Sequence, residues 1–460
     1  MNMQTETKTN EQLKTQLTVY LDRGSATPCS RCLGLELEHF IVDETARKAV
    51  FFEDSDDGRP GVESILRELA QFYQECQYAP QPDGSQRLIG LSRPNANITL
   101  EPGAQLEISI GPVFNISSLE ALYQAFRSEI DPILAHYSYR LLALGTQPFA
   151  EARSIPLLPK QRYHWMDEYF KNTGKHGICM MRASASCQVS IDFSSESDAL
   201  RKLKVANALS PLFYFITDNS PSFETLPLSR GVRRGGTELL TASGLEIPPR
   251  MVRAAIWNDV DPWRSCIAPG SMADDYRFSD YSDFLLSAPA IFSEDILSDG
   301  SYRSNFQNMR TNADVFATLE PTKDIVEHIL SLFFFDNRLK TYVEIRMADS
   351  MPPAYALAFS ALTTGIFYDE ENLNWLAEAL ANVDEAAIAE AKAGLMENAW
   401  GAYVYGRSVA DWLCDLLSRA TTGLDENDHH YLQPLIDLVE SRKTLAIIQM
   451  RRLENGEGFL

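Results

Sequence analysis

The chain has 460 residues, of which 45% are hydrophobic and 23% charged, an ordinary globular composition with ample material for a buried core. Its 41 Lys and Arg against 63 Asp and Glu give a formal net charge of −22, which repels a phosphate backbone, so we expect no nucleic-acid partner. The longest apolar runs, residues 212–216 and 332–335, are far shorter than the roughly 20 residues of a membrane-spanning helix, so we expect no membrane partner either.

Seven scattered cysteines, and a start without the charged-then-apolar order of a signal peptide, favour a reducing, cytoplasmic location. Cys29 and Cys32 form a CxxC pair, but no second pair accompanies them, so we interpret them as loop thiols rather than zinc ligands. We find no linker in the sequence. We therefore expect one catalytic domain over residues 1–460, with flexibility allowed for only in the polar residues 1–20.

The first predicted strand covers residues 34–42, where acidic and apolar residues alternate. Glu36 and Glu38 share one face of this strand, and His39 falls with the apolar residues on the other, which indicates a packed histidine rather than a ligand.

Residues 100–109, LEPGAQLEIS, return to the same alternation, with Glu107 between apolar neighbours. Pro102 and Gly103 interrupt it, either by bending the strand or by forming a turn. The side on which Glu101 lies therefore does not follow from the alternation.

A helix is predicted over residues 117–145, capped by one of the two serines that open it and ended by a glycine. The next strand, residues 187–193, places Gln188 on its polar face, and serines open a second predicted helix over residues 194–209.

Residues 229–236, SRGVRRGG, gather arginines among glycines and are interpreted as a solvated loop rather than a phosphate site. The last predicted strand, residues 341–349, places Glu344 and Arg346 on one face. From residue 371 to 460 the sequence is rich in Ala, Leu and Glu, which predicts a helical layer packed on a sheet. The irregular alternation of strands and helices, without a GxGxxG motif, favours an α+β fold over a dinucleotide-binding one.

Four predicted strands thus carry polar side chains on one face, including the carboxylates of Glu36, Glu38, Glu107 and Glu344. A face exposed to water explains any one such strand. If the four strands are neighbours, however, each close carboxylate pair costs several kcal/mol at an effective dielectric constant of about 20. Positive charge should offset that repulsion.

Mg²⁺ is usually held by a few carboxylates together with substrate phosphates. Because Arg182, Arg253 and Arg346 accompany the acidic strands, the pattern suggests a nucleoside triphosphate held through metal, with guanidinium groups on its phosphates. Zinc fits poorly, since these strands offer hardly any His or Cys at ligand spacing.

Several segments, in order, resemble glutamate-cysteine ligase of the plant and alphaproteobacterial type: GLELEHF, LEPGAQLEISIGP, PKQRYHW, QVSIDFSSESD, RAAIWND and YVEIRMAD. The resemblance covers roughly residues 30–370. It implies a glutamine-synthetase-like carboxylate-amine ligase fold, in which a curved antiparallel sheet forms a funnel surrounded by helices. It also implies the ATP-dependent ligation of L-glutamate to L-cysteine through a γ-glutamyl phosphate, giving γ-glutamylcysteine for thiol or glutathione biosynthesis.

The resemblance further implies ATP as co-substrate, two or three Mg²⁺ ions and a set of site residues. The implied metal ligands are Glu36, Glu38, Glu101, Glu107 and Glu344. Glu344 and Arg346 are the implied catalytic residues. The implied substrate-binding residues are Arg162, Tyr163, Arg182, Gln188, Arg253 and Trp257.

Departures from the plant pattern leave the amine acceptor open. The plant enzymes continue the last motif as RGAD followed by GGPW, where this chain has RMADSMPPA, and their TCTVQ stretch corresponds to ASASCQ here, at residues 183–188. The alternatives are a γ-glutamyl ligase of the same fold with another amine, a metal-dependent amide hydrolase, and a non-catalytic binding relative.

Overall fold

The structure is a computed structural model that describes residues 2–26, 31–43, 45–228, 232–234, 238–240, 244–291, 310–316, 320 and 322–460. Its centre is a ten-stranded antiparallel sheet in the order β14-β15-β8-β1-β6-β5-β4-β3, with β2 and β7 also pairing with β1. The strands are β1 (Leu33–Asp43), β2 (Lys48–Ala49), β3 (Glu75–Pro80), β4 (Gln86–Arg93), β5 (Ala96–Leu100), β6 (Leu106–Val113), β7 (Arg140–Leu142), β8 (Ser186–Ile191), β14 (Asn337–Leu339) and β15 (Val343–Asp349).

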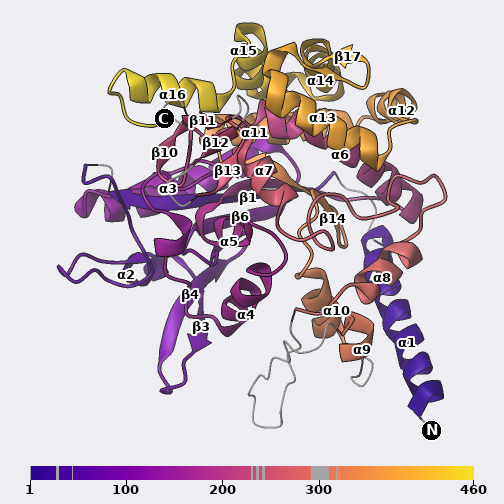
Figure 1. Ribbon diagram of the computed structural model, residues 1–460, viewed down its shortest axis with the longest axis horizontal. Helices are drawn as coiled ribbons and strands as arrows, with labels where there is room; N and C mark the ends of the chain where they lie inside the picture. The colour runs from indigo at the N-terminus through magenta and orange to yellow at the C-terminus, as the bar shows by residue number, and fades with distance from the viewer. Residues whose placement is uncertain are drawn as a thin grey trace.

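Helices surround this sheet, and the predicted α+β architecture is confirmed (Figure 1). Helix α6 (Glu196–Ile216) packs on β15, and α11 (Pro353–Phe367) packs on β8 and β1. The predicted C-terminal helices follow on the same side, coloured orange to yellow: α12 (Glu370–Ala379), α13 (Glu385–Asn398), α14 (Val409–Gly423), α15 (Gln433–Ser441) and α16 (Leu445–Glu454). Apolar residues of the sheet and of these helices belong to one continuous hydrophobic core.

The remaining helices are α2 (Val62–Leu69), α4 (Gln161–Phe170), α5 (Gly177–Ala183), α7 (Val252–Asn258), α8 (Phe278–Ser287), α9 (Asn312–Phe316) and α10 (Lys323–Leu330). The polar start of the chain, where flexibility was allowed for, forms helix α1 (Asn2–Asp22). Leu13, Leu17 and Leu21, spaced by four residues, are buried on it, and the helix packs against α8 and α10.

Helix α3 (Ile116–His136) is shorter than the predicted helix over residues 117–145. Its cap is Asn115, whose side chain accepts a hydrogen bond from the N–H of Ser118, so the predicted serine cap is wrong. The end of the predicted helix forms β7, which pairs with β1 instead. The apolar residues of β7 can be buried in a strand or in a helix. They form a strand because β1 offers backbone groups with which they can pair.

Two other predictions are confirmed. Ser195 caps α6, as expected for a helix opened by serines, although the helix continues to Ile216. His39 is buried, and its Nε2 lies 2.9 Å from the hydroxyl of Tyr123, so it is a packed histidine. Cys29 and Arg230 lie outside the described residues, so the interpretation of the CxxC pair stays a prediction. Within residues 229–236, Arg233 and Arg234 belong to strand β11 (Val232–Arg234), which pairs with β12 (Glu238–Leu240), so the predicted loop is in part a short strand.

Candidate active site

The register of the central strands brings the predicted acids together. Glu38 of β1 lies directly opposite Glu107 of β6, and Glu36 lies opposite Gln188 of β8. Glu344 lies on β15, the next strand beyond β8. Directly opposed residues of antiparallel strands have Cβ atoms about 4.5–5.5 Å apart. The four strands that the alternation singled out are therefore neighbours, and their acids share one face, as predicted.

Glu101 lies in the turn that joins β5 to β6. Its N–H donates to the carbonyl oxygen of Gln105 at 2.9 Å, which closes the turn. Gly103 leaves no room for a side chain, because a Cβ there would lie 2.3 Å from the carbonyl oxygen of Arg182. The Pro102–Gly103 pair is thus a hairpin turn, the simpler of the two expectations, and this turn places Glu101 on the wall of a cavity shared with the acidic strands.

This cavity, which we call the acid cavity, has a volume of about 280 Å³ and three kinds of lining. Its carboxylates are Glu36, Glu38, Glu101 and Glu107. Its guanidinium groups are those of Arg162, Arg253, Arg338 and Arg346. Its apolar wall includes Met166, Met180, Met181, Trp257 and Phe334. Opposed charges beside an apolar wall suit a small, zwitterionic ligand with an anionic end.

The four carboxylates of the acid cavity carry more negative charge than their surroundings offset. Burial, with the nearby charges of Glu107 and Glu344, raises the pKa of Glu36 to about 8. Burial, with the nearby charges of Glu107 and Glu38, raises the pKa of Glu101 to about 8. Burial also raises the pKa values of Glu38 and Glu107. A site built in this way binds a cation readily, because a cation removes both the repulsion and the cost of burying charge.

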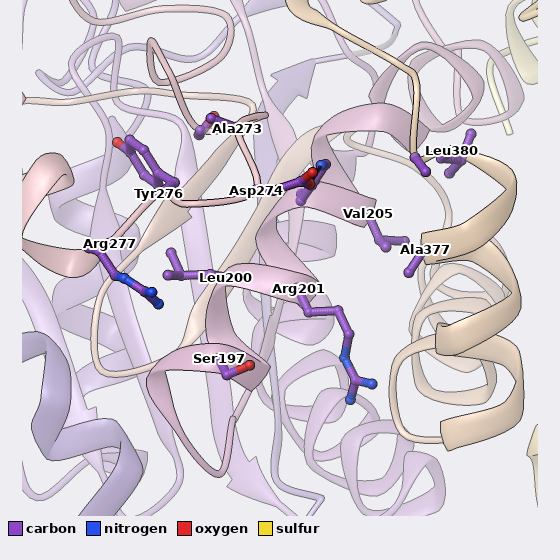
Figure 2. A pocket seen from close by; sticks show the side chains of 13 residues that line it. Ser197, Leu200, Arg201, Val205, Ala273, Asp274, Tyr276, Arg277, Ala377 and Leu380 are labelled. Carbon is purple, nitrogen blue, oxygen red and sulfur yellow. Dashed lines mark hydrogen bonds and ion pairs between the residues drawn. The ribbon is translucent and has the colours of Figure 1, made fainter.

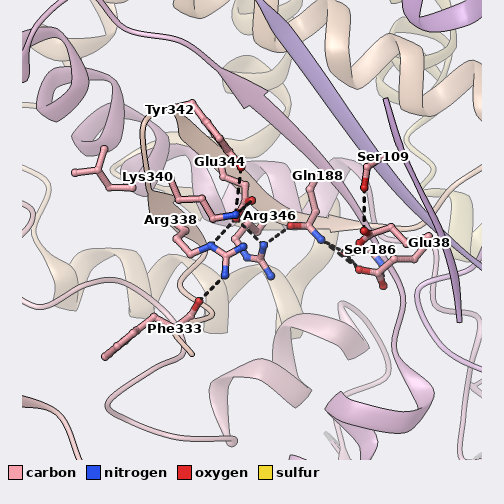
Figure 3. A network of polar contacts seen from close by, with 12 residues as sticks. Glu38, Ser109, Ser186, Gln188, Phe333, Arg338, Lys340, Tyr342, Glu344 and Arg346 are labelled. Carbon is pink, nitrogen blue, oxygen red and sulfur yellow. Dashed lines mark hydrogen bonds and ion pairs between the residues drawn. The ribbon is translucent and has the colours of Figure 1, made fainter. Parts of the chain in front are cut away.

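Glu344 differs from the other acids because three cations surround it (Figure 3). Its carboxylate lies 2.7 Å from Nε of Arg338, 3.0 Å from Nζ of Lys340 and 2.6 Å from Nη1 of Arg346. Burial alone would raise the pKa of Glu344, but the three cations outweigh burial and hold this pKa well below its usual value. Glu344 is fully buried and does not line the acid cavity, and its ion pairs make it an anchor of Arg338 and Arg346. Its roles as metal ligand and catalytic residue stay predictions.

Gln188 connects this cationic group to the carboxylates (Figure 3). Its Oε1 accepts a hydrogen bond from Nη1 of Arg346, and its Nε2 donates to Oε1 of Glu38 at 3.2 Å. Glu38 also accepts from the N–H and the hydroxyl of Ser186, at 2.7 and 2.6 Å. The amide of Gln188 therefore presents its oxygen to a cation and its N–H to an anion, which holds both at the cavity surface.

Three of the predicted substrate-binding residues line the acid cavity from its helical side. Arg162 and Tyr163 lie in the first turn of α4, where Nη2 of Arg162 donates to Oγ of Ser331 at 3.2 Å and the hydroxyl of Tyr163 donates to the carbonyl oxygen of Leu100 at 3.2 Å. Trp257 of α7 is buried, and its Nε1–H has no hydrogen-bond partner among the described residues. An unsatisfied buried donor on a cavity wall is available to a ligand.

The other two predicted arginines have structural contacts. Arg253 donates to the carbonyl oxygens of Met347 (2.9 Å) and Arg346 (3.3 Å), and so holds the irregular part of β15 in place while also lining the cavity. Arg182 donates from Nε and Nη2 to Oδ1 of Asp167, at 3.0 and 2.6 Å, and does not line the cavity. Its helix turns Arg182 toward α4, which gives it a structural ion pair, and its role in substrate binding stays a prediction.

Three further residues of the site did not follow from the predicted strands: Arg338, Lys340 and Ser186. Arg338 and Lys340 have the same parity as Glu344, across a short turn from it, and Arg338 pairs with Glu344 in the β14–β15 register. The alternation would have found both residues if it had been extended a few residues before the predicted strand. Ser186 carries no comparable signal, because its role depends on the pairing of β8 with β1.

The oxygen donors of the acid cavity fit a hard divalent cation such as Mg²⁺. Within the described ranges, no three acidic, imidazole or thiol groups lie close enough together to enclose a metal ion on their own. Mg²⁺ does not require such a cage, because it commonly takes one or two carboxylates and completes its shell with phosphate oxygens and water.

A second cavity, of about 640 Å³, adjoins the acid cavity and shares Glu36 with it. It lies over the other ends of β1, β6 and β8. Its floor is open at Gly34, where a Cβ would lie 3.3 Å from Cβ of Ser190. Apolar side chains such as Ile110 and the ring of Tyr342 border this floor. The second cavity is thus wider and less charged than the acid cavity.

A further cavity, of about 260 Å³, lies between α6 and α12 (Figure 2). Its charged lining residues are Arg201, Lys204, Asp274 and Arg277. None of the predicted site residues belongs to its lining, so we place it outside the active site.

Comparisons of the sequence with known proteins agree on one family. The model of glutamate-cysteine ligase family 2 (GCS2) matches residues 32–457. The chain is 28% identical over 370 residues to glutamate-cysteine ligase B, chloroplastic, of Oryza sativa subsp. japonica, which is 79% of this chain and 68% of the relative. It is 27% identical over 376 residues to the chloroplastic glutamate-cysteine ligase of Arabidopsis thaliana, which is 80% of this chain and 65% of the relative. It is 30% identical over 364 residues to the chloroplastic enzyme of Nicotiana tabacum, which is 78% of this chain and 64% of the relative. The chain thus spans about two thirds of the length of these relatives.

Among solved structures, the complex between the prokaryotic ubiquitin-like protein Pup and its ligase PafA matches 93% of this chain and 68% of that chain, with a TM-score of 0.40 and 10% sequence identity. A likeness of this size carries no conclusion about function.

Proposed function

Because the chain belongs to glutamate-cysteine ligase family 2, we propose that it joins the side-chain carboxylate of L-glutamate to the amine of L-cysteine, using ATP, to give γ-glutamylcysteine. One observation of this molecule carries the proposal: four carboxylates with raised pKa values share a small cavity with four guanidinium groups. That arrangement suits a polyanion bound through metal beside an amino acid.

The residues that would hold Mg²⁺ are Glu36, Glu38, Glu101 and Glu107, and we keep the predicted two or three ions as part of the proposal. When bound, Mg²⁺ neutralises the triphosphate and orients it for in-line transfer. Gln188 would support this group of ligands by its hydrogen bond to Glu38.

The two cavities divide the substrates between them. Because Glu36 lines both cavities, we place the γ-phosphate of ATP where they meet, with the nucleoside part in the second cavity. The floor at Gly34, which lacks a side chain, gives a flat group close access to the sheet. Glutamate and the amine would then occupy the acid cavity.

In the first step, an oxygen of the glutamate side-chain carboxylate attacks the γ-phosphorus, and ADP leaves. Arg346 and Arg338 lie beside the acids on the same sheet face, and Glu344 holds both guanidinium groups in place, so they would offset the charge of the transferring phosphoryl group without having to reorganise. In the second step, the neutral amine nitrogen attacks the acyl carbon, phosphate leaves with the C–O bonding electrons, and the nitrogen gives up one proton to the departing phosphate or to water. Arg162 and the indole N–H of Trp257 would orient the amino-acid substrates.

The apolar wall bears on the identity of the amine. Met166, Met180 and Met181 are flexible and polarisable, and with Trp257 they suit a thiol better than a charged side chain. Ser184 and Ser186, from the segment that departs from the plant pattern, also line the cavity. A different acceptor amine is therefore the alternative that the experiment must distinguish.

The experiment measures phosphate release from ATP and Mg²⁺ with L-glutamate, with and without L-cysteine, and records the product mass in parallel. We expect release that depends on both amino acids and a product of glutamate plus cysteine minus water. If turnover with L-alanine or a diamine equals turnover with L-cysteine, the acceptor is not specifically cysteine. Hydrolysis of a γ-glutamyl amide without ATP would instead support the hydrolase, and absence of any amino-acid dependence would contradict the ligase.

A cytoplasmic location stays a prediction. The names of the plant relatives place those proteins in chloroplasts. Among the helices that the structure describes, none has both the length and the apolar character needed to cross a bilayer.

A further inference from the structure

The N-terminal segment supplies part of the wall of the second cavity. Arg23 and Gly24 belong to the short helix η1 (Arg23–Ala26), which follows α1, and both residues line the cavity. Gly24 packs closely against Phe193 and the backbone of Thr341: a Cβ at this position would lie 2.4 Å from the ring of Phe193 and 2.4 Å from the carbonyl oxygen of Thr341. A side chain at this position would push η1 away, so the absence of one seats Arg23 at the cavity.

The guanidinium group of Arg23 is not held by a described side chain. Its side chain is exposed, and it makes no hydrogen bond or ion pair with any residue that the structure describes. The other charged residues in the described lining of the second cavity are Glu36 and Asp192, both acidic. The cavity wall alone would therefore repel a triphosphate, and Arg23 is the described lining residue that opposes this repulsion.

Arg23 also lies outside the part of the chain that matches the family. The family model begins at residue 32, after α1 and η1, and within the matched part the described lining of the second cavity contains no Lys or Arg. The cation in the described lining of this cavity therefore comes from the segment that precedes the residues matched by the family model.

We propose that Arg23 binds phosphate oxygens of ATP at the second cavity, so that the segment before the family-matched region takes part in nucleotide recognition. The guanidinium group offers a planar fork of donors that matches two phosphate oxygens, and an exposed side chain can reach a ligand without breaking an existing contact. The inference rests on the proposed function, because it takes the nucleotide to lie in the second cavity.

The test compares two ligands that differ in their phosphates. Calorimetric titration of the full chain with ATP and Mg²⁺, without amino acids, is compared with titration by adenosine, which lacks phosphates. Arg23→Ala should weaken ATP binding about tenfold, the loss typical of one charge-assisted hydrogen bond, and leave adenosine binding unchanged. Arg23→Lys should lie between Arg23→Ala and the parent, because an ammonium keeps the charge and loses the fork.

Arg277→Ala is the matched control. Arg277 is likewise exposed, and its guanidinium group makes no hydrogen bond or ion pair with a described residue, but it lines the separate cavity of Figure 2. This variant should bind ATP and adenosine as the parent does and should keep the parent's ligase rate. Thermal unfolding of both variants checks that each is folded.

Unchanged ATP affinity in Arg23→Ala would overturn the inference, and so would an equal loss for ATP and adenosine, which would make Arg23 part of the wall only. The ligase assay on the same preparations separates this inference from the proposed function. If the parent binds ATP through Arg23 but forms no γ-glutamylcysteine, the ligase proposal alone fails. If the parent forms the dipeptide while Arg23→Ala binds ATP normally, this inference alone fails.

Discussion

Glu107→Gln should raise the stability of the metal-free protein while it lowers activity. Glu107 lies directly opposite Glu38 across β1 and β6, and no cation pairs with it among the described residues. Its Oε1 accepts from the hydroxyls of Thr99 (2.8 Å) and Ser109 (3.0 Å), and the amide oxygen of Gln can accept the same two hydrogen bonds. The substitution therefore removes a charge and preserves shape and hydrogen bonding.

The expected gain follows from the geometry. Two unit charges about 5 Å apart repel by about 3 kcal/mol at an effective dielectric constant of about 20. Because the nearby charge of Arg346 acts on both Glu38 and Glu107 and offsets part of this repulsion, we expect a gain of about 1–2 kcal/mol. In a chain of this length that gain raises the melting temperature by about 1–2 °C.

The sign of the pH dependence provides a second measurement. Glu36 and Glu101 have folded-state pKa values of about 8 against an ordinary value of 4.5, so their contribution to stability is complete below pH 4.5 and is lost as the pH rises through about 8. Glu107 contributes to both shifts. The parent should therefore lose stability between pH 5 and 9 in EDTA, and Glu107→Gln should lose less.

The assay is thermal unfolding from pH 5 to 9, in EDTA and in excess Mg²⁺, alongside turnover at saturating ATP and Mg²⁺. We expect turnover of Glu107→Gln to fall about 100-fold, the upper range for loss of a group that supports a metal site. Glu63→Gln is the matched control: Glu63 is 7% exposed against 8% for Glu107, but it pairs with Arg67 and Arg87, each at 2.5 Å. The control should lose stability and keep turnover.

Two results would refute this reasoning. If Glu107→Gln is no more stable than the parent in EDTA at pH 8, the acids of the cavity do not repel one another in the way described. If its turnover equals the parent's at saturating Mg²⁺, Glu107 does not support the metal, whatever its effect on stability.

Three further predictions concern single contacts. Arg346→Lys should lower turnover about 10- to 100-fold, because an ammonium cannot replace the guanidinium contacts with Gln188 and the phosphoryl group, and a rate near the parent's would make Arg346 structural. Arg182→Met should destabilise the fold by about 3 kcal/mol, because its ion pair with Asp167 is lost, and should leave the KM for glutamate unchanged. A raised KM for glutamate with an unchanged melting temperature would instead support a substrate-binding role for Arg182. Trp257→Phe should raise the KM for an amino-acid substrate about fivefold, because one hydrogen bond is lost, and should leave the melting temperature unchanged. Steady-state kinetics with each substrate varied in turn measures this change, and an unchanged KM for every substrate would contradict the role of the indole N–H.

Much of the acid face was predictable because it depends on local geometry. Side chains alternate across a strand with a period of two, so Glu36 and Glu38 had to share a side, and the same held for Glu344 and Arg346. The helical character of residues 371–460 was equally local, since it follows from propensity and apolar spacing.

Errors arose where two conformations satisfied the local pattern equally. The residues of β7 continued the apolar spacing of α3, but β1 offered them an edge to pair with. The motif around Arg182 suggested a cation that binds substrate. The direction of its side chain, however, depends on how α5 packs against α4, and this packing brings Arg182 into an ion pair with Asp167.

By itself, then, the sequence determined which side chains share a strand face, that residues 371–460 are largely helical and to which family the chain belongs, because these follow from short-range periodicity and motif. Only the tertiary structure decided that Glu344 binds three cations while Glu36, Glu38, Glu101 and Glu107 have none as ion-pair partners among the described residues. Both outcomes depend on strand register and on residues far apart in the chain, and burial turns that difference of partners into opposite pKa shifts.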